Sequence, residues 1–561
     1  MKLSSRIVPS CPVAVGCFGA HAQTQKMSAV AGGYVGSGVA ATGEWPLQRT
    51  GQRNAIRLLL ILVNSVLLVA FLTLTATAQS LNTLYEFQGG ADGGAPNELI
   101  RDSAGNLYGT TIAGGKTIFG TVFKIDNSGK KTILYNFLGG TDGTEPHGGL
   151  VRDAEGNLYG TTEYGGDLSV LCAGMQGCGV VFKVDPTGHE TVLYSFTGGA
   201  DGGQPLAGLM LDSAGNLYGT TAGGGIGGCD YWAVGCGVVF KLDSTGKETV
   251  LYSFVGGTDS GVPASPVIGD SSGNLYGLTS GVGAAASGSV FKLDANGKET
   301  VLHAFSNVPD GSQPYGRLVR DGAGNLYGTT YGGGIFDPNN CGDGGCGVVF
   351  EVTPTGKEHV LYSFAGGPRG WGPLAGLARD KQGNLYGAAA LGGAGFACCG
   401  VVFELNPKRE EILLHTFTGA ADGGGPETGL ILDAAGNLYG TAGQGTSGNG
   451  VAFTITPANF KIAISPIRAT VSPGGSIAST LTIAPVAGFT DSVSLSCTVP
   501  SGESLACSVS PNSVTLDGTN SATADLSVSS SLSTPAGAYR IKVKGVFGTL
   551  QHSTVFTLTV M

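Results

Sequence analysis

The stretch Gly215-Asn216-Leu217-Tyr218-Gly219 decides the fold, because the same five residues recur seven times along the 561-residue chain. Successive copies begin 51, 59, 58, 51, 59 and 53 residues apart. A period of about 50 residues is typical of propellers, solenoids and other repeat architectures. The seven copies begin at Gly105, Gly156, Gly215, Gly273, Gly324, Gly383 and Gly436.

Each repeat holds four short segments that are rich in β-branched and aromatic residues. In the third repeat they span residues 208–212, 216–221, 237–242 and 249–254, and Gly, Asp, Asn or Pro residues bound them. This pattern predicts four strands joined by tight turns. Because no window has a clear apolar period of about 3.6 residues, we expect helices to be essentially absent. Four strands repeated seven times predict an all-β chain that forms a seven-bladed β-propeller.

The two ends of the array favour a closed propeller over an open solenoid. Residues 83–87, the first recognisable strand, match the fourth strand of a repeat. The last repeat has its first three strands within residues 429–453, and no fourth strand follows. We therefore expect the N-terminal strand to complete the last blade. A ring that closes in this way needs no capping repeats, which a solenoid would require.

Three blocks of the third repeat carry a family resemblance. They are Gly-Asn-Leu-Tyr-Gly-Thr-Thr at 215–221, Gly-Val-Val-Phe-Lys at 237–241 and Val-Leu-Tyr-Ser-Phe at 250–254. These blocks resemble the GloVer tandem repeats of exported bacterial proteins, and the resemblance covers residues 81–456. The Asp-x-x-Gly-Asn turn is more loosely similar to NHL-type propeller repeats. The resemblance implies an exported, surface-associated protein and carries no catalytic residues to transfer.

The N-terminal 78 residues predict export. Residues 1–50 are rich in Gly, Ala and Ser without a clear period, and we interpret them as a disordered extension or a start codon placed too early. Residues 51–78 contain Arg53 and Arg57, an apolar run and an A-x-A ending, which predict a signal peptide cleaved after Ala78. The run is almost long enough to span a bilayer, so an uncleaved membrane anchor is the alternative. Both interpretations predict a secreted or cell-surface protein.

The composition changes after the predicted propeller, which we assign to residues 79–457. In residues 458–561 glycine becomes less frequent, Ser, Thr and Val become more frequent, and polar and apolar residues alternate. About seven strands with regular turn signals predict an immunoglobulin-like β-sandwich. Residues 535–539 and 557–560 resemble bacterial Ig-like accessory domains.

The charge excludes nucleic acid as a partner. The net charge is −10, only 12% of the residues are charged, and no basic cluster is present, whereas phosphate binding needs a concentrated basic face. We expect a monomer without cofactors.

The cysteines occur as close pairs with irregular spacings, and histidine is scarce. This pattern does not match a zinc site, and in an exported protein it favours disulfides. An adjacent pair can close only as a strained vicinal disulfide or stay reduced, and we expect Cys497 and Cys507 to tie neighbouring strands. The pairs are Cys11/Cys17, Cys172/Cys178, Cys229/Cys236, Cys341/Cys346, Cys398/Cys399 and Cys497/Cys507.

The loops on the two faces of the predicted propeller differ. Repeats followed by a 51-residue step have no cysteine between their second and third strands, whereas the longer steps each contain a pair. Lengthened loops that a disulfide closes are expected to be displayed for contact, with protection from proteolysis as the alternative. On the other face, the aspartates of the Asp-x-x-Gly-Asn turns are expected to cap their own turns rather than bind calcium. We expect the same capping role for the aspartates of the Gly-Gly-x-Asp-Gly loops that begin each blade.

Two groups of residues are candidates for ligand binding. Aromatic side chains in the glycine-rich loops on the cysteine-closed face suit stacking on sugars or insertion into a partner's pocket, although local packing is the alternative. The residue after the loop proline that begins each blade is the most varied position of the repeat. The aromatic candidates are Tyr164, Tyr231, Trp232, Tyr331, Phe336 and Trp371, and the post-proline candidates are His147, Tyr315 and Glu427, beside Asn97, Leu206, Ala264 and Leu374.

No sequence motif predicts catalysis. The chain contains no nucleophile elbow, phosphate loop or metal-ligand spacing, so we expect no metal. We therefore expect a non-catalytic binding protein whose cysteine-closed face contacts a carbohydrate or a protein at the cell surface. A lyase or hydrolase that resembles propeller lactonases is the alternative, with His147 and Glu427 as its candidates.

Overall fold

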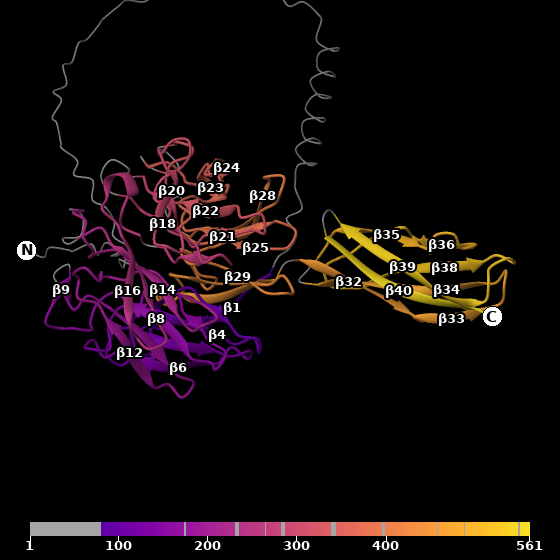
Figure 1. Ribbon diagram of the computed structural model, residues 1–561. Helices are drawn as coiled ribbons and strands as arrows, with labels where there is room; N and C mark the ends of the chain where they lie inside the picture. Colours follow the sequence, from indigo (N-terminus) through magenta and orange to yellow (C-terminus); the bar gives the residue numbers. More distant parts are fainter. Residues whose placement is uncertain are drawn as a thin grey trace, which may run out of the picture. The chain divides into compact units, whose positions relative to one another are not determined.

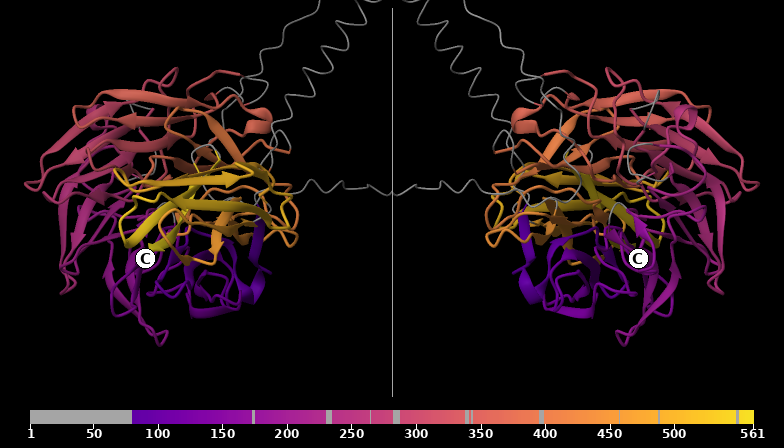
Figure 2. Two further views of the ribbon diagram at one scale, coloured as in Figure 1. Left: turned by 90° about the vertical axis from the view of Figure 1, so that its right-hand side faces the viewer. Right: turned by 90° about the vertical axis from the view of Figure 1, so that its left-hand side faces the viewer.

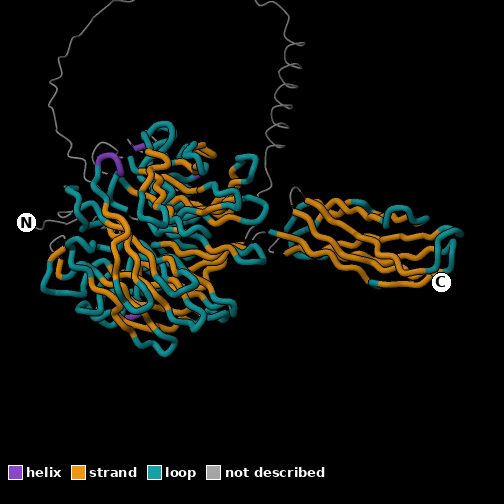
Figure 3. Tube along the Cα trace, in the orientation of Figure 1, coloured by secondary structure: helices purple, strands orange, loops and turns teal. Residues whose placement is uncertain are grey.

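The computed structural model describes residues 80–561, except 173–174, 230–234, 264, 282–286, 338–340, 342–343, 395–398, 457, 487–488 and 548–549. The predicted extension (1–50) and the predicted signal peptide or anchor (51–78) lie outside the described residues. Strands and loops make up nearly all of the described chain, and its helical segments are short 3₁₀ turns (Figure 3). Within this described part, no helix has the length and apolar character needed to cross a membrane.

Seven antiparallel sheets, six of four strands and one of five, follow one another along residues 80–456 of the described chain (Figure 1). Sheet 1 contains β3 (Ile100–Arg101), β4 (Leu107–Ala113), β5 (Thr121–Ile125) and β6 (Lys131–Asn136), and β2 (Gly94–Pro96) also pairs with β4. Sheet 2 contains β7 (Val151–Arg152), β8 (Leu158–Thr162), β11 (Val180–Val184) and β12 (Glu190–Ser195), with the hairpin of β9 (Leu171–Cys172) and β10 (Met175–Gln176) in its long loop. Sheet 3 contains β13 (Met210–Leu211), β14 (Leu217–Thr221), β15 (Val238–Leu242) and β16 (Glu248–Ser253).

The remaining four-stranded sheets of this region repeat the same order. Sheet 4 contains β17 (Ile268–Gly269), β18 (Leu275–Thr279), β19 (Ser289–Leu293) and β20 (Glu299–Ala304). Sheet 5 contains β21 (Val319–Arg320), β22 (Leu326–Thr330), β23 (Val348–Val352) and β24 (Glu358–Ser363). Sheet 6 contains β25 (Ala378–Arg379), β26 (Leu385–Ala389), β27 (Val401–Leu405) and β28 (Glu411–Thr416). Sheet 7 contains β29 (Ile431–Leu432), β30 (Leu438–Ala442), β31 (Val451–Thr456) and the N-terminal β1 (Ser80–Glu86).

The N-terminal strand completes the last sheet, as the sequence predicts. β1 pairs antiparallel with β31 from Ser80↔Thr456 to Glu86↔Val451. Sheet 7 then contacts sheet 1, because the Thr441 hydroxyl donates to the Asn97 carbonyl at 3.2 Å. Figure 2 shows these sheets following one another in chain order.

One aromatic pair is repeated at every junction between consecutive sheets. The phenylalanine that follows the fourth strand of one sheet packs edge-to-face on the phenylalanine of the next sheet's third strand, with ring centroids 5.1–5.3 Å apart. The pair Phe87–Phe123 joins sheet 7 to sheet 1 in the same way as the other six. The junctions therefore form an unbroken cycle. The other pairs are Phe137–Phe182, Phe196–Phe240, Phe254–Phe291, Phe305–Phe350, Phe364–Phe403 and Phe417–Phe453.

The recurring pentapeptide has a packing reason. Asp212 accepts hydrogen bonds from the Asn216 backbone amide at 2.9 Å and from the Tyr218 hydroxyl at 3.1 Å, so it caps the turn before the second strand. Gly215 has a φ of 83°, which favours glycine. A Cβ on Gly219 would lie 2.6 Å from Cζ of Phe240, so this glycine makes room for the core phenylalanine. The predicted capping role of the turn aspartates is confirmed.

The C-terminal region contains two sheets around one apolar core. One sheet has the order β32-β34-β38-β36 and the other β33-β40-β39-β35-β37. Their shared core includes Phe460, Leu481, Ile541 and Phe556, all fully buried. The strands are β32 (Asn459–Ser465), β33 (Arg468–Val471), β34 (Ser476–Val486), β35 (Ser492–Thr498), β36 (Leu505–Ser510), β37 (Ser513–Thr515), β38 (Ala522–Ser530), β39 (Gly537–Phe547) and β40 (Leu550–Val560).

One expectation for this region is wrong. Cys497 and Cys507 form the predicted disulfide, with Cα atoms 6.2 Å apart. They do not tie neighbouring strands of one sheet, because β35 and β36 belong to different sheets. The chain crosses from one sheet to the other in the short connection between these strands, so a bridge spanning only ten residues of sequence still links the two sheets.

Candidate functional site at the loop end of the sheets

Three positions in each sheet lie together at the loop end. They are the residue before the loop proline, the residue after it and the first residue after the second strand (in sheet 1, Ile112 near the end of β4), and we call them the loop-end positions. Ala264, the residue after the proline in sheet 4, lies outside the described residues. Backbone hydrogen bonds connect the first and third positions, as from Glu163 N to Glu145 O at 3.0 Å in sheet 2. The bond from Tyr331 N to Gln313 O in sheet 5 has the same length. The frame is therefore shared, and the side chains that it displays differ from sheet to sheet.

The backbone before the loop proline has the same unusual conformation in every sheet. The φ values of Ala95, Glu145, Gln204, Val262 and Gln313 lie between 53° and 56°. Glycines take this position in sheets 6 and 7, where φ is 65° and 63°. Because the conformation is common to all seven sheets, it belongs to the repeated frame and not to a particular site.

Sheet 2 places three ionisable side chains at its loop-end positions. His147 Nε2 lies 2.9 Å from Glu163 Oε2 and 3.8 Å from Glu145 Oε2. The side chains of His147 and Glu163 are 16% and 13% exposed, and that of Glu145 is 40% exposed. Burial lowers the pKa of His147, but hydrogen bonds and charge interactions with both carboxylates outweigh it and raise the pKa to about 9. Sequence reasoning selected His147 and missed both glutamates, which are distant from each other in the chain.

The segments that carry this cluster are tied together by their backbones. Thr144 N donates to Tyr164 O at 2.9 Å, and Tyr164 N donates back to Thr144 O at 3.3 Å. The Gln204 amide of the next inter-sheet loop reaches the Tyr164 hydroxyl at 3.4 Å. Burial is the main cause that raises the pKa of Tyr164, and the charge of Glu163 adds to it. Tyr164 of sheet 2 thus connects the cluster to Gln204 in the loop that leads into sheet 3.

Sheets 5 and 6 bring aromatic side chains together. The rings of Tyr331 and Trp371 lie 6.3 Å apart between centroids, at an interplanar angle of 48°. Trp371 is half-buried and packs against the apolar core that contains the Cys341–Cys346 disulfide. Tyr315, at the loop-end position of sheet 5, is also half-buried, and Phe336 in the neighbouring loop is exposed. The candidates Tyr231 and Trp232 lie outside the described residues.

The other two post-proline candidates have different roles. Glu427 of sheet 7 keeps solvent-accessible area, yet the protein atoms around it raise its pKa to about 7 through desolvation. Asn97 is buried, and its amide donates to the Thr110 hydroxyl and to the Pro146 carbonyl of the next sheet. Asn97 therefore joins sheet 1 to sheet 2. His147 and Glu427, the two candidates for the lyase or hydrolase alternative, belong to different sheets. The ion pairs of His147 are with Glu145 and Glu163.

An ion pair that sequence reasoning missed joins sheets that do not follow one another in the chain. Arg317 Nη2 of sheet 5 lies 3.7 Å from Glu98 Oε2 of sheet 1. The two sheets on either side of sheet 1 have glycine at the position of Glu98. A Cβ on Gly149 of sheet 2 would lie 3.0 Å from a Glu98 oxygen, and a Cβ on Gly429 of sheet 7 would lie 2.8 Å from one. In the sequence, the signal for this ion pair was a glutamate in one repeat and an arginine in another, at a position where most repeats have glycine. The pair indicates that the inner ends of the sheets converge.

The predicted disulfides of the long loops are confirmed where the structure describes them. Cys172–Cys178, Cys229–Cys236 and Cys341–Cys346 are bonded, and the second cysteine of each is fully buried. Cys399 is also disulfide-bonded, whereas Cys398, Cys11 and Cys17 lie outside the described residues. Disulfides persist in oxidising compartments, so these bonds indicate an extracytoplasmic protein.

The aspartates of the inter-sheet loops cap those loops, as expected. Asp142 accepts from Leu138 N at 2.7 Å and from the Tyr135 hydroxyl at 2.8 Å. Asp201 accepts from Thr197 N at 2.9 Å in the same way. Among the described residues, one group of side chains lies close enough together to hold a metal ion. It consists of Glu145, His147 and Glu163, whose ligand atoms lie within 4.8 Å of one another.

Solved structures similar to this chain match it weakly. A protein of unknown function from Dyadobacter fermentans is 12% identical, with a TM-score of 0.34, over 67% of this chain and 98% of that one. A quinonprotein alcohol dehydrogenase-like protein from Bacteroides thetaiotaomicron is 10% identical, with a TM-score of 0.33, over 58% and 66% of the two chains. The match to a family 123 glycoside hydrolase from Clostridium perfringens has 10% identity and a TM-score of 0.16, and it covers 18% of this chain and only 27% of the hydrolase. With TM-scores this low, these structures do not inform the function.

Sequence families are more informative. No curated protein matches the chain. The model of the Gloeobacter/Verrucomicrobia repeat matches three overlapping segments, residues 70–229, 168–342 and 337–470. Together these segments include all seven sheets of the repeat region and more than half of the chain. The chain therefore belongs to the Gloeobacter/Verrucomicrobia repeat family.

Proposed function

We propose that this protein is an exported, non-catalytic binding protein that contacts carbohydrate through the loop end of a seven-bladed β-propeller. The cycle of phenylalanine pairs and the completion of sheet 7 by β1 support the propeller. We further propose that residues 458–561 form an Ig-like sandwich. The bond from the Tyr539 hydroxyl to the Pro535 carbonyl, 2.7 Å long, supports this because it resembles the tyrosine corner of such domains.

The observation that carries the binding role is the contrast between frame and side chains at the loop end. The backbone bonds and the positive φ recur in every sheet, whereas the displayed side chains do not. A fixed frame with varied side chains is a suitable surface for selective recognition, because it holds the contact residues in place before the ligand arrives.

Sheets 5 and 6 favour carbohydrate as the ligand. The tilted rings of Tyr331 and Trp371 lie 6.3 Å apart between centroids, and Tyr315 lies at the loop end of sheet 5. Gln313, whose backbone carbonyl accepts from Tyr331 N, adds a side-chain amide to the same loop end. Aromatic faces stack on the apolar faces of sugar rings, and amides bond their hydroxyl groups. The disulfide Cys341–Cys346 holds one of these loops, which reduces the entropy lost on binding.

A glycan array with the exported full chain tests this function. Replacing Tyr331 with Ala should weaken binding of the best glycan about tenfold, equivalent to about 1.4 kcal/mol. Ile112→Ala is the matched control, because Ile112 holds the same loop-end position in sheet 1 and should leave binding unchanged.

Three results would argue against parts of this proposal. Equal glycan binding by the Tyr331→Ala variant and the wild type would remove sheet 5 from the site. Capture of a protein ligand without any glycan binding would favour a protein partner. Turnover of a bound glycan or lactone, lost in His147→Ala, would favour the hydrolase or lyase alternative.

A further inference from the structure

We propose that Glu145, His147 and Glu163 form a binding site for one divalent transition-metal ion of the zinc type. The site lies at the loop end of sheet 2, whereas the proposed carbohydrate contact lies at sheets 5 and 6. The two proposals therefore rest on different residues, and either can fail without the other.

The distances fit a single metal ion. Ligand atoms around tetrahedral zinc, with bonds of about 2.0–2.2 Å, lie roughly 3.4 Å apart. His147 Nε2 is 2.9 Å from one glutamate oxygen and 3.8 Å from the other, so the observed spacings bracket this value. All three ligand atoms lie within 4.8 Å of one another. Small side-chain rotations would bring them to coordination distance.

The donor types fit the same class of metal. One imidazole nitrogen and two carboxylate oxygens suit zinc and its neighbours better than calcium, which takes more oxygen ligands and no imidazole. Three protein ligands leave a fourth position open in a tetrahedral site, an arrangement typical of sites that bind a water or a ligand group. The loop end is where such a group would arrive.

The backbone holds the three ligands in place. Glu163 N donates to Glu145 O at 3.0 Å, and the paired residues Thr144 and Tyr164 flank this bond. His147 lies two residues beyond Glu145, on the other side of Pro146, whose ring restricts the chain between the two ligands. The cluster therefore needs little ordering when a metal ion binds.

The other sheets show that this combination is particular to sheet 2. They have the same frame, yet none has three metal-ligand side chains at its loop-end positions. An ion pair alone explains a histidine beside one carboxylate, as for His303 and Asp310 at 3.1 Å. His147 instead lies beside two carboxylates, so the group offers three ligand atoms where the His303 pair offers two. The loop-end residues are Ala95, Asn97 and Ile112 in sheet 1, Gln204, Leu206 and Ala222 in sheet 3, Val262, Ala264 and Ser280 in sheet 4, Gln313, Tyr315 and Tyr331 in sheet 5, Gly372, Leu374 and Ala390 in sheet 6, and Gly425, Glu427 and Gly443 in sheet 7.

Titration calorimetry of the full chain with ZnCl₂ tests the site. The wild type should bind one Zn²⁺ ion per chain, and His147→Gln and Glu163→Gln should each weaken this binding at least tenfold. His303→Gln is the matched control, because His303 pairs with a single carboxylate and should not contribute. Bound Co²⁺ should give the visible absorption of a four-coordinate ion in the wild type, and His147→Gln should abolish it.

The proposal is overturned if the wild type binds no Zn²⁺, or if His147→Gln and His303→Gln bind it equally. Circular dichroism and the thermal midpoint establish that each variant is folded. If His147→Gln does not fold, Glu145→Gln decides the matter, since Glu145 is the most exposed of the three ligands. An unchanged affinity in that variant would likewise contradict the site.

Discussion

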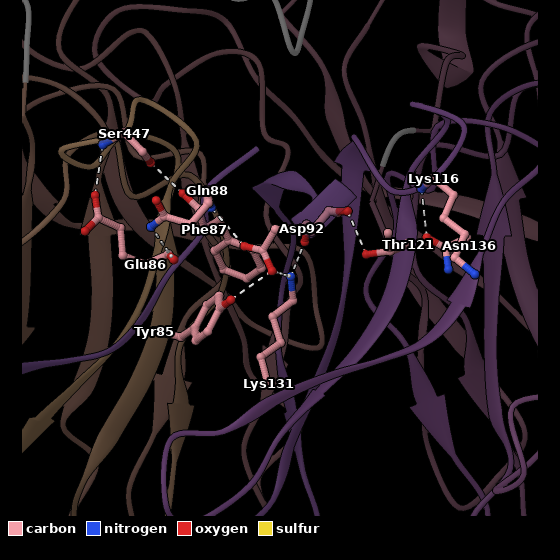
Figure 4. Close-up of polar contacts among 11 residues, drawn as sticks. Tyr85, Glu86, Phe87, Gln88, Asp92, Lys116, Thr121, Lys131, Asn136 and Ser447 are labelled. Atoms are coloured by element: carbon pink, nitrogen blue, oxygen red, sulfur yellow. Dashed lines mark hydrogen bonds and ion pairs between the residues drawn. The ribbon is translucent and has the colours of Figure 1, made fainter. Parts of the chain in front are cut away.

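Two kinds of junction between consecutive sheets differ in charge although they share one backbone frame. At six of the seven junctions a residue of the inter-sheet loop faces the first residue of the next sheet's fourth strand. Between sheets 7 and 1 these residues are Asp92 and Lys131, whose charged atoms lie 3.0 Å apart (Figure 4). At four other junctions two acidic residues face each other instead. Those pairs are Asp142 and Glu190, Asp201 and Glu248, Asp259 and Glu299, and Asp310 and Glu358.

The acidic junctions hold their glutamates in the protonated form up to near-neutral pH. Burial, followed by the charge of the facing aspartate, raises the pKa of each of these four glutamates to about 7. The four are Glu190, Glu248, Glu299 and Glu358. The junctions therefore depend on pH, although the phenylalanine pairs beneath them are the same throughout.

The Lys131 junction is an ion pair inside an aromatic pocket. Lys131 Nζ donates to the Asp92 backbone carbonyl and lies 4.5 Å from the centroid of the Phe87 ring, and the Tyr85 hydroxyl donates to Asp92 at 2.8 Å (Figure 4). Burial lowers the pKa of Lys131 despite the nearby carboxylate. Burial also opposes the charge on Asp92, but its hydrogen bonds lower its pKa overall. The lowered pKa of Lys131 indicates that burial opposes the ion pair, whereas the lowered pKa of Asp92 indicates that its partners stabilise the charged form. The geometry decides the effect of breaking the pair, because either group would be left unpaired.

Converting the Lys131 junction into the acidic kind should have the largest effect. Lys131→Glu places a second carboxyl group beside Asp92, at a side chain that is only 2% exposed. We expect a loss of about 3 kcal/mol in the free energy of unfolding at pH 8, measured by urea denaturation. Lys130→Glu is the control, because Lys130 is its exposed neighbour. Equal losses in both variants would show that the pocket does not matter.

Neutralising one acidic junction should have an intermediate effect. The folded-state pKa of Glu248 lies above the ordinary value of 4.5. The protonated Glu248 carboxyl group therefore makes its full contribution to stability below pH 4.5, and this contribution is lost as pH rises through about 7. Glu248→Gln keeps the uncharged shape. It should therefore stabilise the protein by about 1–2 kcal/mol at pH 8, after discounting for partial exposure, and change little at pH 4.5. Urea denaturation at both pH values measures this, with the exposed Glu155→Gln as control. A gain that is the same at both pH values would contradict the titration.

The smallest effect is expected at the junction of sheets 5 and 6, where an arginine replaces the loop aspartate. Arg369 pairs with Glu411, but its side chain is 56% exposed. The Tyr362 hydroxyl also donates to Glu411 at 2.9 Å and would remain after Arg369→Ala. We therefore expect a loss of about 1 kcal/mol or less at pH 7. A loss as large as that of Lys131→Glu would mean that exposure does not set the strength of these pairs.

The repeated elements of the fold could be predicted because short-range chemistry specifies them. The Asp-x-x-Gly-Asn turn needs only residues that are close in the chain, and each capping hydrogen bond in it joins residues at most six positions apart, as from Tyr218 to Asp212. The close spacing of cysteines predicted the loop disulfides for the same reason. The role of β1 followed from counting strands, since seven sheets of four strands need one strand from the other end of the chain.

The contacts between distant segments could not be predicted. Nothing near His147 indicated that Glu163 would lie beside it, and Glu98 and Arg317 are separated by more than three sheets of sequence. The bridge Cys497–Cys507 was predicted as a pair but assigned to one sheet, because sequence spacing does not reveal where a chain changes sheets.

The amino-acid sequence by itself determined the strands, their turns, the number of repeats and the pairing of neighbouring cysteines, because propensity, periodicity and short loops act over a few residues. Tertiary structure alone decided which charged side chains meet. A repeated frame brings equivalent positions together in every sheet, so the chemistry at the loop end and at the junctions depends on which residues occupy those positions after the sheets have packed.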